Sequence, residues 1–471
     1  MIFSSHIFLL YFLPLFLVVY FLVPSKGRNL VLLLASIVFY AWGAPDFILI
    51  LLASTVANFY LVKAMHHAVR PAMKKLFCTL AIFISLGLLA YFKYANFFVD
   101  NANALLSALG LGTMTWTKVL LPIGISFFTF QSITYVVDTY RGVNTPMQRL
   151  TDYVVYIIMF PQLIAGPIVR YTDIADQITA RRRLRWEECL QGFYRFVIGL
   201  SKKVLIADVI GRTVDVVLGG DLAAMDTGTA WVTITAYTMQ LYFDFSGYSD
   251  MAIGLGRIMG FRFPENFDNP YTSASITEFW RRWHITLGAF MRNYLYIPLG
   301  GNRHGTARTY FNLWVVFLLS GLWHGASWNF VFWGLYFGLI VAIEKFTVLR
   351  WKVPAPVAHL YSLILVILGW GIFYFTDFSR MTDFFPVLFG KAVAATDFTV
   401  RSALTSRFWL WIAAIVCCLP LGRWIGGWFE KRAIGHNVLH ILQTVFAVAV
   451  LAVSVALLVG GTSNPFIYTR F

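Results

Sequence analysis

The chain has 471 residues, of which 59% are hydrophobic and only 13% are charged, and its formal net charge is +15. Soluble domains carry about 25% charged residues, so this composition excludes an ordinary soluble globular protein and predicts a polytopic membrane protein. The basic residues stand in short loops between apolar runs. That pattern is the topology signal of a bacterial inner membrane protein and argues against a nucleic-acid-binding surface.

Apolar runs that are long enough to cross or nearly cross a bilayer recur along the chain and predict about eleven transmembrane helices. Several are shorter than the roughly 20 residues of a simple span. The runs cover residues 7–23, 29–44, 46–62, 76–92, 118–137, 229–243, 311–323, 326–344, 357–375, 405–422 and 437–460. Residues 153–165 and 189–210 are too short or too polar to span, so we expect re-entrant or interfacial segments there.

Loop charges predict which side of the membrane each end of the chain faces. Residues 1–23 have neither a basic segment nor a small-residue cleavage site, so we expect a retained first helix instead of a signal peptide. The first loop is basic, the second has no base, and the third is basic again, which places the N-terminus outside under the positive-inside rule. Two later basic loops place the C-terminus outside as well; their bases are Lys345, Arg350, Lys352, Arg423, Lys431 and Arg432.

Two acids, Asp244 and Asp250, interrupt a predicted apolar helix. They stand six residues apart, about 240° around a helix, so they do not form a paired-carboxylate site on one face. We expect each to cap or bond a local partner, and one of them could orient a catalytic imidazole. The neighbouring sequence Phe-Ser-Gly at 245–247 lacks the Gly-x-Ser-x-Gly pattern of a serine nucleophile.

The stretch TEFWRRWH at 277–284 alternates polar and aromatic residues. On a helix, Glu278 and Arg282 stand four apart and can pair, while Arg281 and His284 stand three apart and share a face. Both arginines are candidates for binding donor phosphates, although an amphipathic helix at the cytoplasmic interface explains them at least as well. We favour a functional role for His284, because it is the second histidine beside intramembrane-type sequence.

The most informative stretch is SGLWHGASW, which places His324 in a long apolar run. No charged residue occurs from Thr309 to Ile343. An ionisable residue in such a segment is a functional hypothesis by default, because its burial in hydrocarbon is costly. The alternative is a core histidine bonded to a backbone carbonyl. Gly321 and Gly325 would let a substrate or another helix approach the ring closely.

A metal site is poorly supported by the sequence. The four cysteines show no ligand spacing, and two of them, Cys417 and Cys418, are adjacent. His284 and His324 stand far from any third ligand in the sequence. We therefore expect no metal and no bound cofactor.

Several motifs in the chain resemble those of the membrane-bound O-acyltransferase (MBOAT) family. The principal matches are YFDFSGYSD at 242–250, FWRRWH at 279–284 and GLWHG at 321–325. Further matches are FKYANF at 92–97, LPIGISF at 121–127, FPQLIAGP at 160–167 and PLGGNR at 298–303. The resemblance covers nearly the whole chain and is closest to the branch that O-acetylates alginate.

The resemblance implies an all-α polytopic fold whose helices wrap around a central tunnel. It implies a single transmembrane domain over residues 1–471 with a motif-bearing core at about 118–345. In that tunnel His324 would be the catalytic histidine and His284 a second functional polar residue. Asp244 and Trp323 are candidates for orienting groups or for polar groups that line the tunnel.

The C-terminal tail, residues 461–471, ends in FIYTRF. An aromatic anchor at the membrane interface is one interpretation. Related acyl-export systems carry a C-terminal Phe-x-Tyr-x-x-Phe motif whose tyrosine relays the acyl group, and the resemblance makes Tyr468 a candidate for that relay. The eight residues from Asn464 onward span at most about 26 Å, so the tail could reach a mid-membrane histidine from the outer face.

We therefore expect a membrane O-acetyltransferase that takes acetyl groups from a cytoplasmic thioester, acetyl-CoA, with His324 as general base on an acceptor hydroxyl. The expected partners are a periplasmic SGNH-type acetyltransferase, membrane lipid and, indirectly, a polysaccharide such as alginate, cellulose or peptidoglycan. One alternative is D-alanyl transfer to teichoic acid from a carrier protein. Another is a polysaccharide or lipid transporter, for which we find no clear internal repeat.

Overall fold

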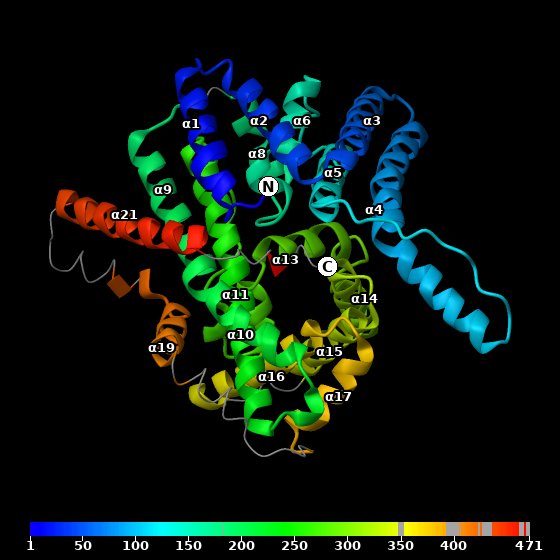
Figure 1. The fold of residues 1–471 in the computed structure, drawn as a ribbon. Coiled ribbons are helices and arrows are strands. Elements are labelled where there is room, and N and C mark those ends of the chain that lie inside the picture. The colour runs from blue at the N-terminus through cyan, green and yellow to red at the C-terminus, as the bar shows by residue number, and fades with distance from the viewer. Residues whose placement is uncertain are drawn as a thin grey trace. The chain divides into compact units, whose positions relative to one another are not determined.

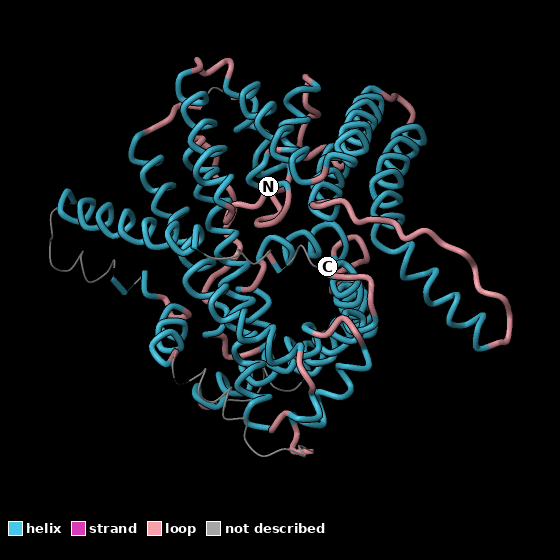
Figure 2. The backbone as a smooth tube through the Cα atoms, viewed as in Figure 1, coloured by secondary structure: helices cyan, strands magenta, loops and turns pink. Residues whose placement is uncertain are grey.

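The computed structural model describes residues 1–180, 182–346, 353–391, 405, 407–422, 424–425, 436–460 and 466–467. Throughout these residues the regular structure is helical, as Figure 2 shows, with one isolated antiparallel bridge between Phe267 and Trp283. The all-α prediction is thus confirmed. Seven residues named in the predictions lie outside the described part: Arg350, Lys352, Arg423, Lys431, Arg432, Asn464 and Tyr468.

The chain forms two compact units. Unit 1 comprises Met1–Phe193 and Ala252–Pro264, and unit 2 comprises Tyr194–Met251 and Glu265–Phe471. The helices of unit 1 (Figure 1) are α1 (Leu13–Leu22), α2 (Arg28–Gly43), α3 (Ile48–His67), α4 (Pro71–Ala108), α5 (Ile125–Tyr140), α6 (Leu150–Ile158), α7 (Phe160–Leu163) and α8 (Tyr171–Thr179). Helices α9 (Trp186–Ser201) and α11 (Thr227–Ile258) contribute residues to both units.

The remaining helices belong to unit 2. They are α10 (Asp208–Gly219), α12 (Ile276–Arg282), α13 (Ile285–Met291), α14 (Gly305–His324), α15 (Trp328–Phe346), α16 (Ala355–Tyr374), α17 (Phe378–Leu388), α19 (Phe408–Cys417) and α21 (His436–Gly460). Short α12 and α13 carry the TEFWRRWH motif, and α14 carries His324 near its end.

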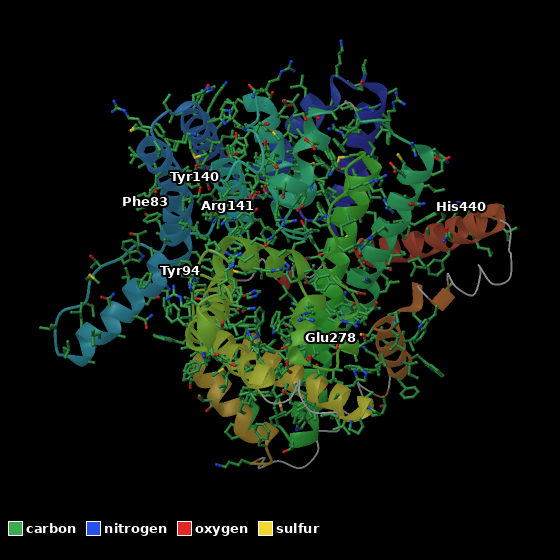
Figure 3. The ribbon with its side chains drawn as sticks, turned by 180° about the vertical axis from the view of Figure 1, so that it is seen from behind. Phe83, Tyr94, Tyr140, Arg141, Glu278 and His440 are labelled. Carbon is green, nitrogen blue, oxygen red and sulfur yellow. The ribbon has the colours of Figure 1, made fainter. Side chains whose placement is uncertain are left out.

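Four helices in the described part are long and apolar enough to cross a membrane. They are Pro45–His67, Pro71–Ala108, Ala355–Tyr374 and His440–Gly460. Their outer faces are apolar: Phe83 on α4 is 72% exposed and points away from unit 1 (Figure 3), as expected of a side chain that faces lipid. The other predicted runs also contain helices, but these are shorter or more polar than a simple span.

The run predicted at 118–137 is helical only in its second part, because α5 begins at Ile125. Gly124, just before it, has a φ of +79°, which a residue without a Cβ adopts readily. A Cβ at this position would also lie 2.5 Å from the carbonyl oxygen of Leu163. The close approach of the α7 backbone therefore fixes where α5 starts.

Helices α14 and α15 of unit 2 pack closely side by side (Figure 1). A Cβ on Gly321 would lie 2.2 Å from the carbonyl oxygen of Phe330, and one on Gly334 would lie 2.5 Å from that of Phe317. Small residues permit this approach between helix backbones. The prediction that the glycines beside His324 admit another helix is confirmed.

The end of α14 is fixed by the same packing. Gly325, which follows the last helical residue His324, has an extended backbone with φ −169° and ψ 159°. A Cβ there would lie 2.0 Å from the ring of Phe330. The helix therefore stops at the histidine, and the imidazole is held at a break between α14 and α15.

Candidate functional site

His324 lies in an aromatic surrounding within unit 2. Its ring centroid is 4.8 Å from Trp323, 4.9 Å from Trp333 and 5.2 Å from Phe373. The side chains come from α14, α15 and α16, and only 4% of His324 is exposed. Such a setting keeps bulk water away from the imidazole.

Trp323 contacts both candidate histidines. Its ring centroid lies 4.8 Å from that of His324 and 5.8 Å from that of His284, which is 1% exposed. The indole comes from α14, whereas His284 precedes α13. The structure thus brings two motifs that are separate in the sequence, FWRRWH and GLWHG, into contact through one indole.

His284 does not continue α12, so the prediction that it shares a helical face with Arg281 is wrong. The helix ends at Arg282, and His284 has a φ of 46° and a ψ of 54°, in the left-handed region. Backbone hydrogen bonds explain the break, because Ile285 N–H donates to Asn266 O and Asp268 N–H donates to Arg282 O, both at 3.0 Å. Left-handed backbone at a non-glycine residue costs about 1–3 kcal/mol and is often found at functional sites.

Asn266 holds the ring of His284. The histidine Nδ1 lies 3.0 Å from Asn266 Oδ1, which also accepts from the Oγ1 of Thr286 at 2.9 Å. Asn266 Nδ2 donates to Ser249 Oγ at 3.1 Å. Burial lowers the pKa of His284 to about 3. Asn266 was not predicted from the sequence, because a single loop asparagine has no distinguishing pattern.

His284 lines a pocket of about 230 Å³ inside unit 2. The other lining residues are mostly apolar and include Trp283, Gly288 and Met291. Arg292 is the cationic residue of this lining. The pocket is therefore a small, largely apolar space with an imidazole in its wall.

Asp244 binds a lysine and the C-terminal tail. Its Oδ1 lies 2.6 Å from Nζ of Lys203, which also pairs with Asp208 at 2.7 Å. Its Oδ2 accepts a hydrogen bond from the backbone N–H of Ile467 at 2.8 Å. Asp250 pairs instead with Lys202 at 2.6 Å and with an arginine of α9. The ion-pair partners of both acids stand on a distant segment of the chain, so the prediction of a local partner for each acid is wrong.

The tail residues Phe466 and Ile467 are buried within unit 2, with 1% and 3% of their surfaces exposed. The Phe466 ring stacks on Tyr248 at 4.8 Å and lies 5.9 Å from Phe245. Phe245 in turn makes an edge contact with His284 at 4.7 Å. One ring of α11 therefore separates the docked tail from the candidate histidine. Tyr468, the next residue, lies outside the described part of the chain.

The arginines of α12 differ in their contacts. Arg282 pairs with Glu278 at 2.6 Å, which confirms the predicted pair, and Figure 3 labels Glu278 on this helix. Arg282 also donates to Thr272 Oγ1 at 3.2 Å. Arg281 is exposed. Of the two candidates for donor phosphates, Arg281 is thus the more accessible.

Glu344 is a second residue of this region that was not predicted from the sequence. Its carboxylate is fully buried and accepts from the backbone N–H groups of Ile276 and Thr277 at 2.6 and 2.7 Å. A carboxylate at a helix N-terminus satisfies free N–H groups and complements the helix dipole. The sequence feature that could have identified Glu344 is its place as a lone acid at the end of apolar α15. Glu344 anchors the helix that leads into His284.

Comparisons with known proteins agree with the motifs. A profile described as "MBOAT, membrane-bound O-acyltransferase family" matches residues 143–382, which include both histidines. The chain is 48% identical over 378 residues to "Probable alginate O-acetylase AlgI" of Azotobacter vinelandii, covering 79% of this chain and 75% of that protein.

Two further relatives have names that refer to other polymers. The chain is 36% identical over 410 residues to "Peptidoglycan O-acetyltransferase" of Helicobacter pylori, covering 79% of this chain and 77% of that protein. It is 28% identical over 236 residues to "Teichoic acid D-alanyltransferase" of Bacillus subtilis, covering 48% and 59%.

Proposed function

This chain belongs to the membrane-bound O-acyltransferase family, and we propose that it carries acetyl groups from cytoplasmic acetyl-CoA toward an exported polysaccharide. Family membership makes it a multi-pass membrane protein and an O-acyltransferase. Relatives matched along 79% of the chain are named for O-acetylation, whereas the D-alanyltransferase matches only 48% of it. That difference favours acetyl over D-alanyl transfer. The higher identity to the alginate O-acetylase, 48% against 36% for the peptidoglycan enzyme, favours alginate as the polymer.

The observation that carries the proposal is the contact of one indole, Trp323, with two buried histidines. His324 acts as general base: it takes the proton of an acceptor hydroxyl while the oxygen bonds to the thioester carbonyl carbon. The C–S bond then breaks, and the departing thiolate takes the proton back from the imidazolium. Positioned base catalysis contributes about 10²–10⁴-fold in rate.

The acetyl-CoA enters from the cytoplasmic side of a bacterial inner membrane protein whose termini both face outward. Arg281, exposed on α12, is suited to the donor phosphates because a guanidinium binds phosphate through two parallel hydrogen bonds. Arg282, which already pairs with Glu278, is the second candidate. No bound cofactor is needed for this chemistry.

Tyr468 serves as the acceptor hydroxyl in this proposal. Its position directly after the docked Phe466 and Ile467 supports the assignment over a simple interfacial anchor. A phenol has a pKa near 10, so it needs a base to become a nucleophile at neutral pH. The aryl acetate then passes its acetyl group to a serine of an SGNH-type partner, the phenol regains its proton, and the partner acetylates the polymer.

The deciding experiment compares donors. Purified protein in lipid nanodiscs is supplied with radiolabelled acetyl-CoA or with a D-alanyl carrier protein, and label on the protein is counted. We expect label from acetyl-CoA, and none in a His324→Ala variant that folds normally. Label from the carrier alone would establish the D-alanyl alternative, and transport of polymer without labelling would establish the transporter.

A further inference from the structure

Asn266 is a buried residue, 1% exposed, whose side-chain orientation is fixed by its neighbours. The backbone N–H of Thr286 points at one end of the amide from 3.3 Å. A backbone N–H can only donate a hydrogen bond, so the atom that it meets must be the amide oxygen. The other end of the amide, Nδ2, donates to Ser249 Oγ at 3.1 Å.

This orientation determines where the proton of the His284 ring lies. Nδ1 of the ring is 3.0 Å from the same amide oxygen, which has no hydrogen to give. Nδ1 must therefore carry the hydrogen, because two acceptors at this distance would repel each other in a buried place. In a neutral imidazole the other nitrogen, Nε2, then holds the lone pair.

Nε2 of His284 is buried, and within the described residues no group donates a hydrogen bond to it. The ring lines the pocket of about 230 Å³ described above. Buried acceptors are nearly always satisfied, and each exception in a native structure calls for an explanation. A substrate that occupies the pocket and brings a donor group supplies that explanation.

We propose that Asn266 is a positioning residue that locks His284 in the Nδ1–H form, so that Nε2 accepts a hydrogen bond from an O–H or N–H group of a substrate. A carbonyl or carboxylate cannot serve there, because it has no hydrogen to donate. The donor group is either an amide N–H of the pantetheine arm of acetyl-CoA or the hydroxyl of the acyl acceptor as it binds, before its one hydrogen turns to His324. The identity of these substrates rests on the proposed function, whereas the ring form does not.

The first test measures the ring form in the full-length protein without substrate. Nitrogen-15 spectra of histidine-labelled protein in nanodiscs, with His284 assigned by its loss in His284→Gln, distinguish Nδ1–H from Nε2–H. We expect Nδ1–H in the wild type and in Asn266→Asp, which keeps an acceptor oxygen, and a mixture of both forms in Asn266→Leu. An Nε2–H wild type would overturn the proposal even if acetyl-CoA is turned over normally.

The second test measures acetyl transfer from radiolabelled acetyl-CoA in inverted membrane vesicles. Asn266→Leu should lose between about 10-fold and 10⁴-fold in rate, the range seen when a group that orients a histidine is removed. Asn266→Asp should recover part of that loss. Gln148→Leu, which removes an exposed amide outside this site, is the control and should stay within a fewfold of wild type.

The kinetic constants identify the substrate group. A higher KM for acetyl-CoA in Asn266→Leu assigns the pantetheine amide, and a lower maximal rate with unchanged KM assigns the acceptor hydroxyl. Wild-type KM and rate in a folded Asn266→Leu protein would overturn the proposal. If Asn266→Leu does not fold, the wild-type spectrum and the Asn266→Asp kinetics still test whether Asn266 fixes the ring form of His284. Failure of acetyl-CoA as a donor for the wild type would count against the proposed function alone.

Discussion

The backbone N–H of Ile467 donates a hydrogen bond to Oδ2 of Asp244 across 2.8 Å, and both residues are almost fully buried. The other carboxylate oxygen of Asp244 lies 2.6 Å from Nζ of Lys203. One carboxylate therefore links a buried cation to the C-terminal tail. Hydrogen bonds to charged groups are stronger than neutral ones, so this contact should contribute measurably to docking of the tail.

The Ile467→Pro variant removes the donated N–H and leaves an apolar side chain. We expect polymer acetylation to fall about tenfold or more, because a hydrogen bond to a charged group contributes about 1.5–3 kcal/mol. Polymer-bound acetate, normalised to protein in the membrane, is the measurement. Ile467→Val keeps the N–H and is the control that should retain activity. Equal acetate from the two variants would contradict a docking role for this bond.

The Tyr468→Phe variant removes one hydroxyl and keeps the aromatic ring. We expect it to abolish polymer acetylation while binding of acetyl-CoA survives, because a relay needs the phenol oxygen and an anchor does not. Mass spectrometry of the wild-type tail should find acetyl on Tyr468. Full activity in the variant, or a cytoplasmic location for a tag placed after Phe471, would leave the tail as an anchor.

The His324→Ala variant should lose all measurable acetylation while it remains folded and inserted, because it removes the proposed base. Loss of a positioned base typically lowers the rate by about 10²–10⁴-fold. His359→Ala, an exposed histidine on α16, is the matched control and should behave like the wild type. Wild-type acetate from a stably expressed His324→Ala protein would refute the assignment.

Substitutions in the TEFWRRWH motif should separate the histidine from the arginines. His284→Ala should lose most activity. Arg281→Lys and Arg282→Lys should lose less, because lysine keeps the positive charge, although it loses the two parallel hydrogen bonds of a guanidinium. Donor turnover at several acetyl-CoA concentrations is the measurement. If the arginine variants turn over donor more slowly than His284→Ala does, these roles are assigned wrongly.

The pKa of His284, lowered by burial to about 3, predicts how stability depends on pH. An unfolded histidine titrates near 6.5, so between about pH 6.5 and 3 the unfolded chain binds a proton that the folded protein does not. The stability contribution of the neutral ring is complete above about pH 6.5 and falls by about 1.4 kcal/mol per unit as the pH decreases.

Thermal unfolding of purified protein, followed by tryptophan fluorescence between about pH 7 and pH 5, tests this prediction. The wild type should lose more stability over this range than His284→Gln, which has no titrating ring. Parallel curves for the two proteins would show that His284 is not buried as a neutral group.

The sequence by itself determined the helical membrane fold and the location of His324. Apolar runs predict membrane helices because the bilayer core supplies no water, and a helix satisfies its own backbone through local hydrogen bonds between residues four apart. The pair between Glu278 and Arg282 follows the same local rule and was found for the same reason. His324 stood out because burial of a titratable group in an apolar segment is costly, which suggests a function. That cost can be recognised from the neighbouring residues in the sequence alone.

Only the tertiary structure decided what surrounds the candidate site. His284 leaves the helix because the backbone at 282–285 bonds to the segment at 266–268, and its ring partner lies 18 residues away in the sequence. The tail contact of Asp244 joins residues 223 positions apart. Hydrogen bonds between such distant residues leave no periodic pattern in the sequence. They form where the packed helices leave backbone N–H and C=O groups without a partner inside a helix. Which groups these are is determined only when the chain folds.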